Sequence, residues 1–381
     1  MGFFDNFLQE SHLMVRQTAK RFALDEVRPH AMKWEEAGEF PLELYEKAAK
    51  AGILGVGFDE QVGGSGGGPM EQVMVIEGLM YGGSTGVAAG LGSLGIALPP
   101  IVQSGDARLI DEFVRPALRG EKICGLAITE PGTGSDVAAV STRAERDGEE
   151  YVVHGAKMFI TSGVRADFLT VLVRTGDDPH GGLSFLVVET EREGVTRSAP
   201  LKKHGWWASD TAEIGFDDVR VPVENLVGAE GGGFLTLMQN FQSERLALAA
   251  YGAITAELAL KEALSYCAER KAFGRPIQKF QVNRHKLVEM KTKVVTAKTL
   301  VYQVAHRMAA GEYLVEEVSM AKNVACDVAM EVCDEAVQLH GGMGYMRESL
   351  VERLYRDARL LPIGGGTREV MKEIIARQMG L

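Results

Sequence analysis

The stretches Phe168–Val173 (FLTVLV) and Ser184–Val188 (SFLVV) decide the fold, because they are rich in the β-branched and aromatic residues that strands favour. Two further runs, Tyr151–His154 (YVVH) and Met158–Thr161 (MFIT), precede them and are separated by a turn at Gly155. Gly and Asp interrupt the runs at short intervals. The pattern is typical of a small antiparallel β-barrel or sandwich in the middle of the chain.

Helical patterns precede this β region. Residues 41–50 begin with Pro41, which suits a first helical turn, and residues 107–118 form a second short helical pattern. The glycine-rich run at residues 63–68 follows no strand, so we interpret it as a flexible loop and not as a nucleotide-binding fingerprint. The first third of the chain is therefore predicted to be helical.

The chain after the β region is also helical in pattern, with apolar residues recurring every three to four positions. Glycine and proline breaks divide it into four long helices, roughly residues 234–269, 281–310, 314–340 and 367–379. Such helices are expected to form an antiparallel bundle. The sequence thus predicts an α+β fold with an N-terminal helical domain (1–122), a middle antiparallel β-barrel (123–228) and a C-terminal four-helix bundle (229–381).

Composition narrows the possible functions. The 381 residues predict two or three domains, and the net charge of −11 argues against nucleic acids and anionic membranes as partners. The apolar run Leu91–Val102 is too short to span a bilayer, and the acidic N-terminus predicts no secretory signal. The four cysteines form no CxxC pair and there is no HExxH, so we expect no metal site and a reducing compartment.

Two segments near the β region carry groups suited to ligand binding. Residues 127–136 (AITEPGTGSD) form a loop whose backbone N–H groups and hydroxyls can meet a planar or anionic ligand. In residues 157–163 (KMFITSG), Phe159 and Thr161 are two apart and therefore share one face of a strand. Taken singly, the first segment is better interpreted as an ordinary loop and the second as ordinary strand packing.

Two more segments lie in the helical C-terminal third. Residues 269–274 (ERKAFG) place Arg270 at a helix end, where it can bind a pyrophosphate or simply complement the helix dipole. Residues 338–345 (QLHGGMGY) place three glycines after a helix end, which allows close approach to a ligand or merely caps the helix.

Together, the four segments resemble the acyl-CoA dehydrogenases, in the order and spacing of that family and over nearly the whole chain. The resemblance implies a helical, β-barrel, helical architecture, FAD as cofactor, and an acyl-CoA substrate. It also implies a homotetramer, a dimer of dimers in which a neighbouring subunit completes each FAD site. The expected electron acceptor is electron-transfer flavoprotein.

The resemblance carries over residue by residue. The residues implied to contact FAD are Leu126, Ile128, Thr129, Phe159 and Thr161 around the flavin, Arg270, Phe273 and Gln281 on the FAD of the adjacent subunit, Gln338, Gly341 and Gly342 near the phosphates, and Thr367 and Glu369 near the adenosine half. Thr161 would approach flavin N5, and Phe159 stands where many relatives carry Trp. Ser135 would bind the CoA portion, beside the cofactor, and Glu369 departs from the amide common at its position.

The catalytic base is the main departure from the common pattern. The reaction needs a carboxylate to remove the proton α to the thioester carbonyl, while flavin N5 accepts the β-hydride. Many relatives carry this Glu at the position of Gly365, which cannot take a proton. The long-chain and isovaleryl-type branch places it on a bundle helix instead, and Glu244 occupies that position. Without the resemblance, Glu244 would be interpreted as a solvated helix charge.

The other substrate contacts follow from the same resemblance. Arg245 is expected to position the substrate or to form a buried ion pair, and the backbone N–H of Gly365, with Gly366 beside it, is expected to meet the thioester oxygen. Small residues at 85–94 either leave a deep acyl cavity or only let helices pack closely.

We therefore expect an enzyme of fatty-acid metabolism, acting in β-oxidation on a long-chain or methyl-branched acyl-CoA. The alternatives are an acyl-CoA oxidase of the same fold and a non-catalytic acyl-CoA-binding scaffold. The expected location is the bacterial cytoplasm, or the mitochondrial matrix if the chain is a mature eukaryotic form.

Overall fold

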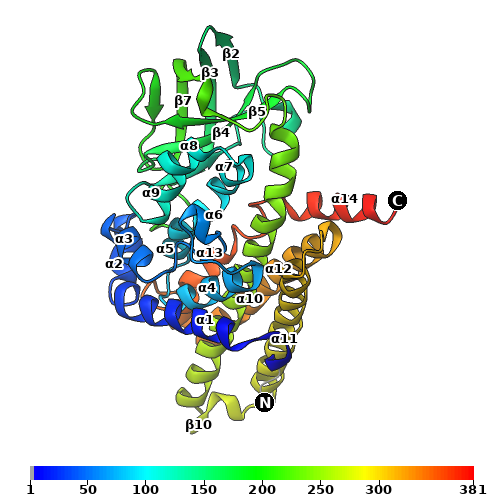
Figure 1. The fold of residues 1–381 in the computed structure, drawn as a ribbon. Coiled ribbons are helices and arrows are strands. Elements are labelled where there is room, and N and C mark those ends of the chain that lie inside the picture. Colours follow the sequence, from blue (N-terminus) through cyan, green and yellow to red (C-terminus); the bar gives the residue numbers. More distant parts are fainter. Residues whose placement is uncertain (1–3) are drawn as a thin grey trace.

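The computed structural model describes residues 4–381 and has a helical part, a β part and a second helical part in sequence order (Figure 1). The first part holds nine α-helices in its described residues: α1 Glu10–Phe22, α2 Ala31–Ala37, α3 Glu43–Lys50, α4 Pro69–Met80, α5 Thr85–Gly92, α6 Leu94–Ala97, α7 Pro99–Ser104, α8 Ala107–Leu109 and α9 Arg115–Leu118. A π-helical turn, Ile110–Val114, joins α8 to α9. The helices predicted at 41–50 and 107–118 are confirmed.

The glycine-rich run at residues 63–68 is a loop, as predicted, and backbone hydrogen bonds tie it to residues 55–58. The Gly57 N–H donates to Gly66 O at 2.8 Å, the Ser65 N–H donates to Gly55 O at 2.8 Å, and the Gly66 N–H donates to Phe58 O at 2.9 Å. These hydrogen bonds hold the run against residues 55–58. Val56 and Phe58 of that segment line the cavity described below.

The segment Thr85–Ser104 has the length and mean hydropathy of a membrane-spanning helix, so the apolar stretch is longer than the run Leu91–Val102 considered from the sequence. In the structure it is divided among α5, α6 and α7, and 72% of it is buried inside the fold. A segment buried in this way is typical of the core of a folded domain. Its apolar character is explained by packing against the protein itself.

The β part is one eight-stranded sheet in the order β6-β7-β3-β2-β4-β5-β8, with β1 pairing beside β4. Its strands are β1 Cys124–Ala127, β2 Arg143–Asp147, β3 Glu150–Thr161, β4 Phe168–Arg174, β5 Leu183–Glu189, β6 Val195–Arg197, β7 Thr211–Pro222 and β8 Leu226–Val227. The strands predicted at 168–173 and 184–188 are confirmed as β4 and β5. The runs at 151–154 and 158–161 belong to one continuous strand, β3, so the turn predicted at Gly155 is wrong; the chain has only a register shift there.

The sheet is mixed, and the prediction of a purely antiparallel barrel is wrong in this respect. Strand β1 pairs with β4 in parallel, from Cys124 opposite Phe168 to Ala127 opposite Val171. Strand β2 also meets β4 in parallel, at Arg143 opposite Arg174. Parallel pairing needs a long connection, and the chain between β1 and β4 provides it with the β1–β2 loop and strands β2 and β3. The β1–β2 loop contains the candidate ligand-binding residues 127–136.

The second helical part is built on three long helices, α10 Gly233–Glu269, α11 Gln281–Ala309 and α12 Val315–His340. These match the first three predicted helices of the bundle. The short strands β9 Lys271–Ala272 and β10 Arg275–Pro276 form the hairpin between α10 and α11, and two further helices, α13 Leu350–Ala358 and α14 Arg368–Gln378, follow.

The bundle differs from the prediction in its fourth helix. Helix α14 makes its main contact with α12, projects from the body of the molecule (Figure 1), and buries only Met371 among its residues. Helix α4 from the N-terminal part instead packs against both α10 and α11. The two helical parts consequently share one apolar core, while the strands enclose a second, smaller one.

Candidate active site

A cavity of about 760 Å³ lies where the three parts of the chain meet. Its wall includes most of the residues predicted around the flavin and the substrate: Leu126, Ile128, Thr129, Ser135, Phe159, Thr161, Glu244, Gly365, Gly366 and Thr367. They come from the β1–β2 loop, the end of β3, the first turns of α10, and the loop before α14. The fold therefore brings together segments separated by more than two hundred residues.

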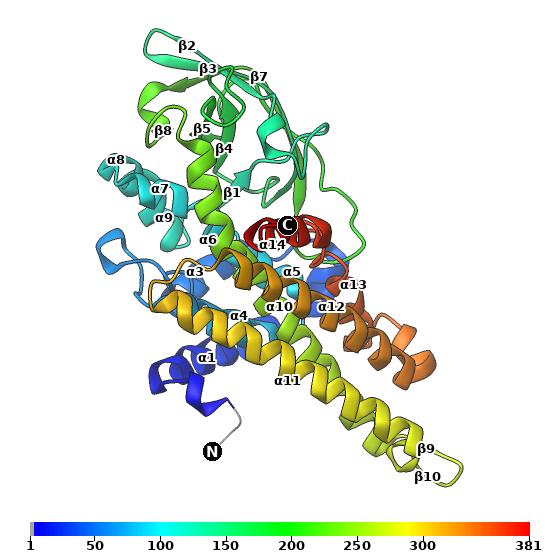
Figure 2. The same cartoon turned by 90° about the vertical axis from the view of Figure 1, so that its right-hand side faces the viewer.

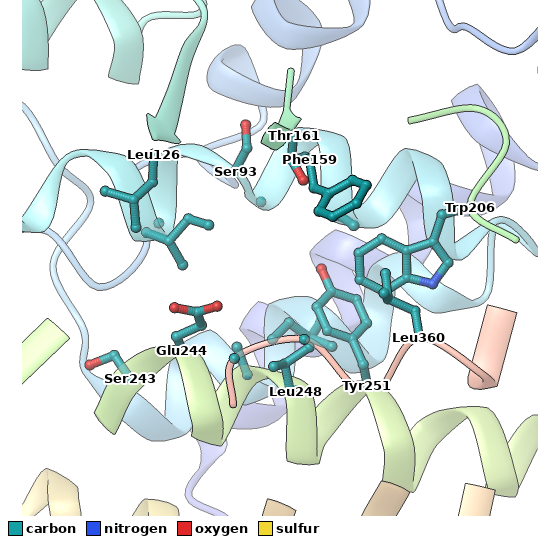
Figure 3. A pocket seen from close by; sticks show the side chains of 18 of the residues that line it. Ser93, Leu126, Phe159, Thr161, Trp206, Ser243, Glu244, Leu248, Tyr251 and Leu360 are labelled. Carbon is teal, nitrogen blue, oxygen red and sulfur yellow. The ribbon is translucent and has the colours of Figure 1, made fainter. Parts of the chain in front are cut away.

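The end of β3 directs an aromatic ring into the cavity. Phe159 has φ +61°, a left-handed conformation that costs energy for a residue with a side chain, and the pairing of β3 with β7 shifts register between Lys157 and Ile160. This bulge leaves Phe159 61% exposed, while Thr161 lies beside it in the view of Figure 3. An exposed aromatic held in a strained backbone is ready to cover a planar ligand.

A buried ion pair fixes the β1–β2 loop against β3. The ammonium of Lys157 lies 2.8 Å from Glu130 Oε1 and donates to Ile128 O at 3.0 Å. Glu130 also accepts from the N–H and hydroxyl of Ser141 and from the Thr142 N–H. Burial alone would raise the pKa of Glu130, but Lys157 and these donors lower it to about 2, so the carboxylate stays charged.

Glu244 points into the cavity from α10, about three turns after the start of the helix (Figure 3). Its carboxylate has no hydrogen-bond partner within residues 4–381, although the side chain is partly buried. Burial raises the pKa of Glu244, and the positive charges of Arg245 and Lys322 act in the opposite direction. A carboxylate with a raised pKa, facing an apolar cavity, is suited to accepting a proton from carbon.

Gly365 faces Glu244 across the cavity and leaves room for it. A Cβ atom placed on Gly365 would lie 3.3 Å from Glu244 Oε1 and 2.4 Å from Leu248 Cδ1. The backbone at Gly365 has φ +61°, which also favours glycine. A side chain at position 365 would therefore collide with Leu248 and crowd the Glu244 carboxylate in this backbone.

Two buried cations, Arg245 and Lys322, lie close enough to Glu244 to act on its charge. The Arg245 guanidinium lies 5.4 Å from the centre of the Phe241 ring, does not line the cavity, and keeps its buried Nε without a hydrogen-bond partner in the described chain. Lys322 is fully buried on α12 and donates from Nζ to Gly366 O at 2.6 Å. Lys322 thus ties α12 to the glycine loop that faces the base.

Three protein-family models cover almost all of this chain: the N-terminal domain of acyl-CoA dehydrogenase over residues 9–121, the middle domain over 125–219, and the C-terminal domain over 231–380. The chain belongs to the acyl-CoA dehydrogenase family. It is a flavin-dependent oxidoreductase of fatty-acid metabolism that acts on acyl-CoA, and the family uses FAD.

Individual relatives agree with this family. The chain is similar to a probable acyl-CoA dehydrogenase from Mycobacterium abscessus, with 51% identity, a TM-score of 0.97, and coverage of 98% of this chain and 100% of that one. It is 38% identical to the mitochondrial long-chain specific acyl-CoA dehydrogenase of Sus scrofa, over 97% of this chain and 86% of the relative. It is 36% identical to the caffeyl-CoA reductase-Etf complex subunit CarC of Acetobacterium woodii, over 97% and 98% of the two chains.

The cavity of this acyl-CoA dehydrogenase fits the flavin of FAD. The ring of Phe159 is exposed to it, and the hydroxyls of Thr129 and Thr161 face it without a hydrogen-bond partner in the part of the chain that the structure describes. A flavin needs an apolar cover for its ring and donors at its polar edge, and these residues supply both. When bound, FAD supplies the hydride acceptor of the reaction.

The remaining predicted FAD residues do not reach this cavity. Arg270 follows Glu244 by twenty-six positions on α10, which places it roughly 39 Å further along the helix axis. Phe273 and Gln281 follow in the hairpin and at the start of α11, at the far end of the long helices in Figure 2, and Phe273 is 94% exposed.

The end of α12 lies at this same far end. The ring of Tyr266 on α10 stacks on His340 at 4.2 Å, and the Arg270 N–H donates to Tyr266 O at 2.8 Å. The chain therefore gathers the exposed residues Arg270, Gln338, Gly341 and Gly342 into a second group, while Leu339 and His340 between them are buried. This group shares no wall with the cavity.

Helix α14 begins beside the cavity and turns its exposed face outward. The Thr367 hydroxyl accepts from the Val370 N–H at 3.2 Å and caps the helix, which gives Thr367 a structural role alongside its place in the cavity wall. Glu369 is exposed, and hydrogen bonds from its own backbone and from Thr367 lower its pKa.

Sequence reasoning missed three residues of the site. Lys322 is a lysine on an otherwise apolar face of α12, next to Ala321 and Ala325 in the core, and this break in the pattern is a usable signal. Tyr251 and Trp206 line the cavity but carry no motif, because one is an aromatic in a buried helix and the other lies in a loop.

Proposed function

We propose that this enzyme converts a long-chain or methyl-branched acyl-CoA to the trans-2-enoyl-CoA, with Glu244 as the base that removes the α-proton. The observation that supports this most directly is the 3.3 Å separation between Glu244 Oε1 and the position of a Cβ on Gly365. A carboxylate carried by α10 reaches the place from which a carboxylate at position 365 would act.

Glu244 receives the α-proton as the Cα–H bond breaks, and the pair of electrons left on the α-carbon forms the new double bond while the β-hydrogen leaves as hydride. The thioester oxygen gains negative charge at this stage and needs donors. Gly365 lines the cavity and its N–H has no backbone acceptor within residues 4–381, so we propose that this N–H donates to the thioester oxygen. The neighbouring Gly366 is held by Lys322.

The lining of the cavity supports a large acyl group. Leu54, Val73, Ile76 and Leu79 extend it as an apolar arm into the N-terminal helical part. The glycines at 85–94 contribute less than their number indicates, because a Cβ at Gly86 or Gly90 would meet the protein itself, and these two serve packing.

The exposed group at the far end of the long helices supports an FAD site shared between subunits. Arg270, Phe273 and Gln281 are too far from the cavity of their own chain to touch the same FAD molecule. We propose that they serve the FAD of a neighbouring chain in a homotetramer, with Gln338, Gly341 and Gly342 near the dinucleotide phosphates and Ser135 near the CoA portion.

Electron-transfer flavoprotein is the proposed electron acceptor, in keeping with the relative that is named as part of an Etf complex. The proposed location is the bacterial cytoplasm.

An anaerobic titration tests the proposal. The purified flavoprotein is titrated with palmitoyl-CoA and, separately, with isovaleryl-CoA, while the flavin absorbance band is followed. Loss of the band with palmitoyl-CoA supports both the base and the large acyl pocket. Loss only with isovaleryl-CoA keeps the base and contradicts the long-chain part. A flavin band that neither thioester bleaches contradicts the proposed substrates, and equal bleaching of the Glu244→Gln variant contradicts the base.

A further inference from the structure

Tyr251 lies on the same face of α10 as Glu244, two turns further along. The seven positions between them correspond to roughly 10 Å of helix, and two helical turns return a side chain to nearly the same direction. Figure 3 shows both side chains rising from α10 into the cavity, with the Tyr251 hydroxyl at the tip. Tyr251 is only 6% exposed, so this hydroxyl faces the cavity and not the surrounding solvent.

The Tyr251 hydroxyl has no hydrogen-bond partner among residues 4–381. Two polar groups of the same wall are already engaged. The indole N–H of Trp206, whose ring centre lies 6.1 Å from that of Tyr251, donates to Asp357 O at 3.1 Å. The Ser93 hydroxyl donates to Gly90 O at 2.9 Å. The other side chains near the ring in Figure 3, Leu248 and Leu360, are apolar.

Gly92 completes this end of the cavity. A Cβ on Gly92 would lie 3.2 Å from the Tyr251 hydroxyl, so the absence of a side chain on α5 provides the space in which the hydroxyl stands. The Tyr251 hydroxyl, in the space that Gly92 leaves, is therefore a polar group in a cavity wall that is otherwise mostly apolar.

A plain alkyl chain that filled this space would displace water and leave the hydroxyl unpaired. Burying a hydroxyl without a partner is unfavourable, whereas an oxygen on the substrate at the same depth would satisfy it. We propose that Tyr251 is a specificity-determining residue that hydrogen-bonds an oxygen atom on the acyl chain, so that the preferred substrate is an oxygenated acyl-CoA. This inference rests on the proposed function and narrows its substrate class.

The experiment compares matched thioesters with the flavin-loaded enzyme. The probes are hexanoyl-, octanoyl- and decanoyl-CoA and their terminal-hydroxy counterparts. At the chain length that places the oxygen beside Tyr251, the hydroxylated thioester is expected to have a kcat/KM about tenfold above that of its alkyl match. In Tyr251→Phe, which removes only the oxygen, the ratio is expected to fall to about one.

A second readout separates binding from turnover. In the Glu244→Gln background, the dissociation constants of the same pairs, measured by calorimetry, are expected to show the same preference and to lose it in the double variant with Tyr251→Phe. Tyr45→Phe is the matched control, because its hydroxyl donates to Gly90 O at 3.1 Å and does not line the cavity. Its hydroxyl-to-alkyl ratio is expected to equal that of the wild type.

Three results overturn the inference: equal kcat/KM for every pair in the wild type, a preference that survives in Tyr251→Phe, or a Tyr251→Phe variant whose main change is in the flavin spectrum or in FAD retention. Efficient oxidation of the alkyl series with no hydroxyl preference would leave the proposed function standing. Failure of every thioester to bleach the flavin would instead contradict the proposed function.

Discussion

The two ends of helix α10 differ in their surroundings: one end lies in an enclosed cavity formed by a single chain, and the other end is exposed. At the N-terminal end, Glu244 faces a cavity whose walls come from all three parts of the fold. At the C-terminal end, Arg270 and the neighbouring Phe273 are exposed, and the hairpin that carries them extends to the tip of the molecule (Figure 2). The same helix thus supplies an enclosed chemical centre and an exposed binding group.

The cavity around Glu244 and the exposed residues near Arg270 therefore depend on different contacts. The enclosed end depends on the shape of this chain alone, because its critical distances are all internal. The exposed end carries Phe273, whose ring meets Phe280 edge-on at 6.1 Å, and Arg270, whose guanidinium has no hydrogen-bond or ion-pair partner within residues 4–381, as a site shared with a neighbouring chain would require. Changes at the two ends are therefore expected to fail in different ways.

The largest effect is expected at the enclosed end. Glu244→Gln keeps the shape of the side chain and removes its ability to accept a proton, so kcat is expected to fall by about 10²- to 10⁴-fold. FAD content, measured from absorbance, is expected to stay the same. Glu262→Gln on the same helix is the matched control and is expected to retain wild-type kcat. A loss of FAD in Glu244→Gln would mean that the two ends are not separable.

A smaller effect is expected for Gly365→Ala. The new methyl group would collide with Leu248 and press on Glu244, and the positive φ would strain the backbone. Displacement of the base is expected to lower kcat/KM by up to about 100-fold. The control is Gly364→Ala, whose Cβ would have only ordinary contact, 3.9 Å from Leu360 O. Equal effects of the two substitutions would refute the steric argument.

The exposed end is expected to respond through cofactor retention. Arg270→Ala is expected to weaken FAD binding about tenfold, because a charge-assisted hydrogen bond is lost, while the fully loaded enzyme keeps its kcat. FAD release on dilution, followed by fluorescence, measures this. Arg275→Ala is the control from the same hairpin, since the Arg275 guanidinium is stacked on Phe280 at 4.3 Å. Unchanged FAD retention in Arg270→Ala would remove the main support for a shared site.

The smallest effect is on stability. The pKa of Glu244 in the folded chain is raised by burial, so the folded state holds this proton more tightly than the unfolded state. Stability is then lost as the pH rises from the unfolded pKa, about 4.3, through the folded one. Glu244→Gln lacks this loss, so its Tm is expected to exceed that of the wild type at about pH 8 and to converge with it at low pH. A Tm difference independent of pH would contradict the raised pKa.

Much of the fold was predictable, because strands β4 and β5 and helices α10, α11 and α12 carry strong local periodicity. The parallel pairing of β1 with β4 was not, since it depends on a strand of four residues whose partner lies more than forty positions away. The fourth position of the bundle was also missed, because nothing local in Pro69–Met80 reveals that this helix packs against α10 and α11.

The candidate site was predictable where chemistry follows from a motif. Glu244 and Gly365 were paired through the resemblance to the family, and the structure brings them close together. Tyr251 and Lys322 were not predicted, because their roles follow only from what surrounds them in the folded chain. A tyrosine in a buried helix is ordinary until its hydroxyl is found facing a cavity, and Lys322 acquires a role only through the carbonyl of Gly366.

The placement of the base on a long helix has a consequence for how the enzyme can evolve. The position of Glu244 is set by the hydrogen-bond ladder of α10, while the segment 362–367 between α13 and α14 contributes backbone groups and shape. Proton removal and the fit of the acyl chain are thereby encoded in different segments. Mutation can remodel the outline of the substrate pocket through Gly92 and Tyr251, or through positions of that segment other than Gly365, without relocating the group that starts the reaction.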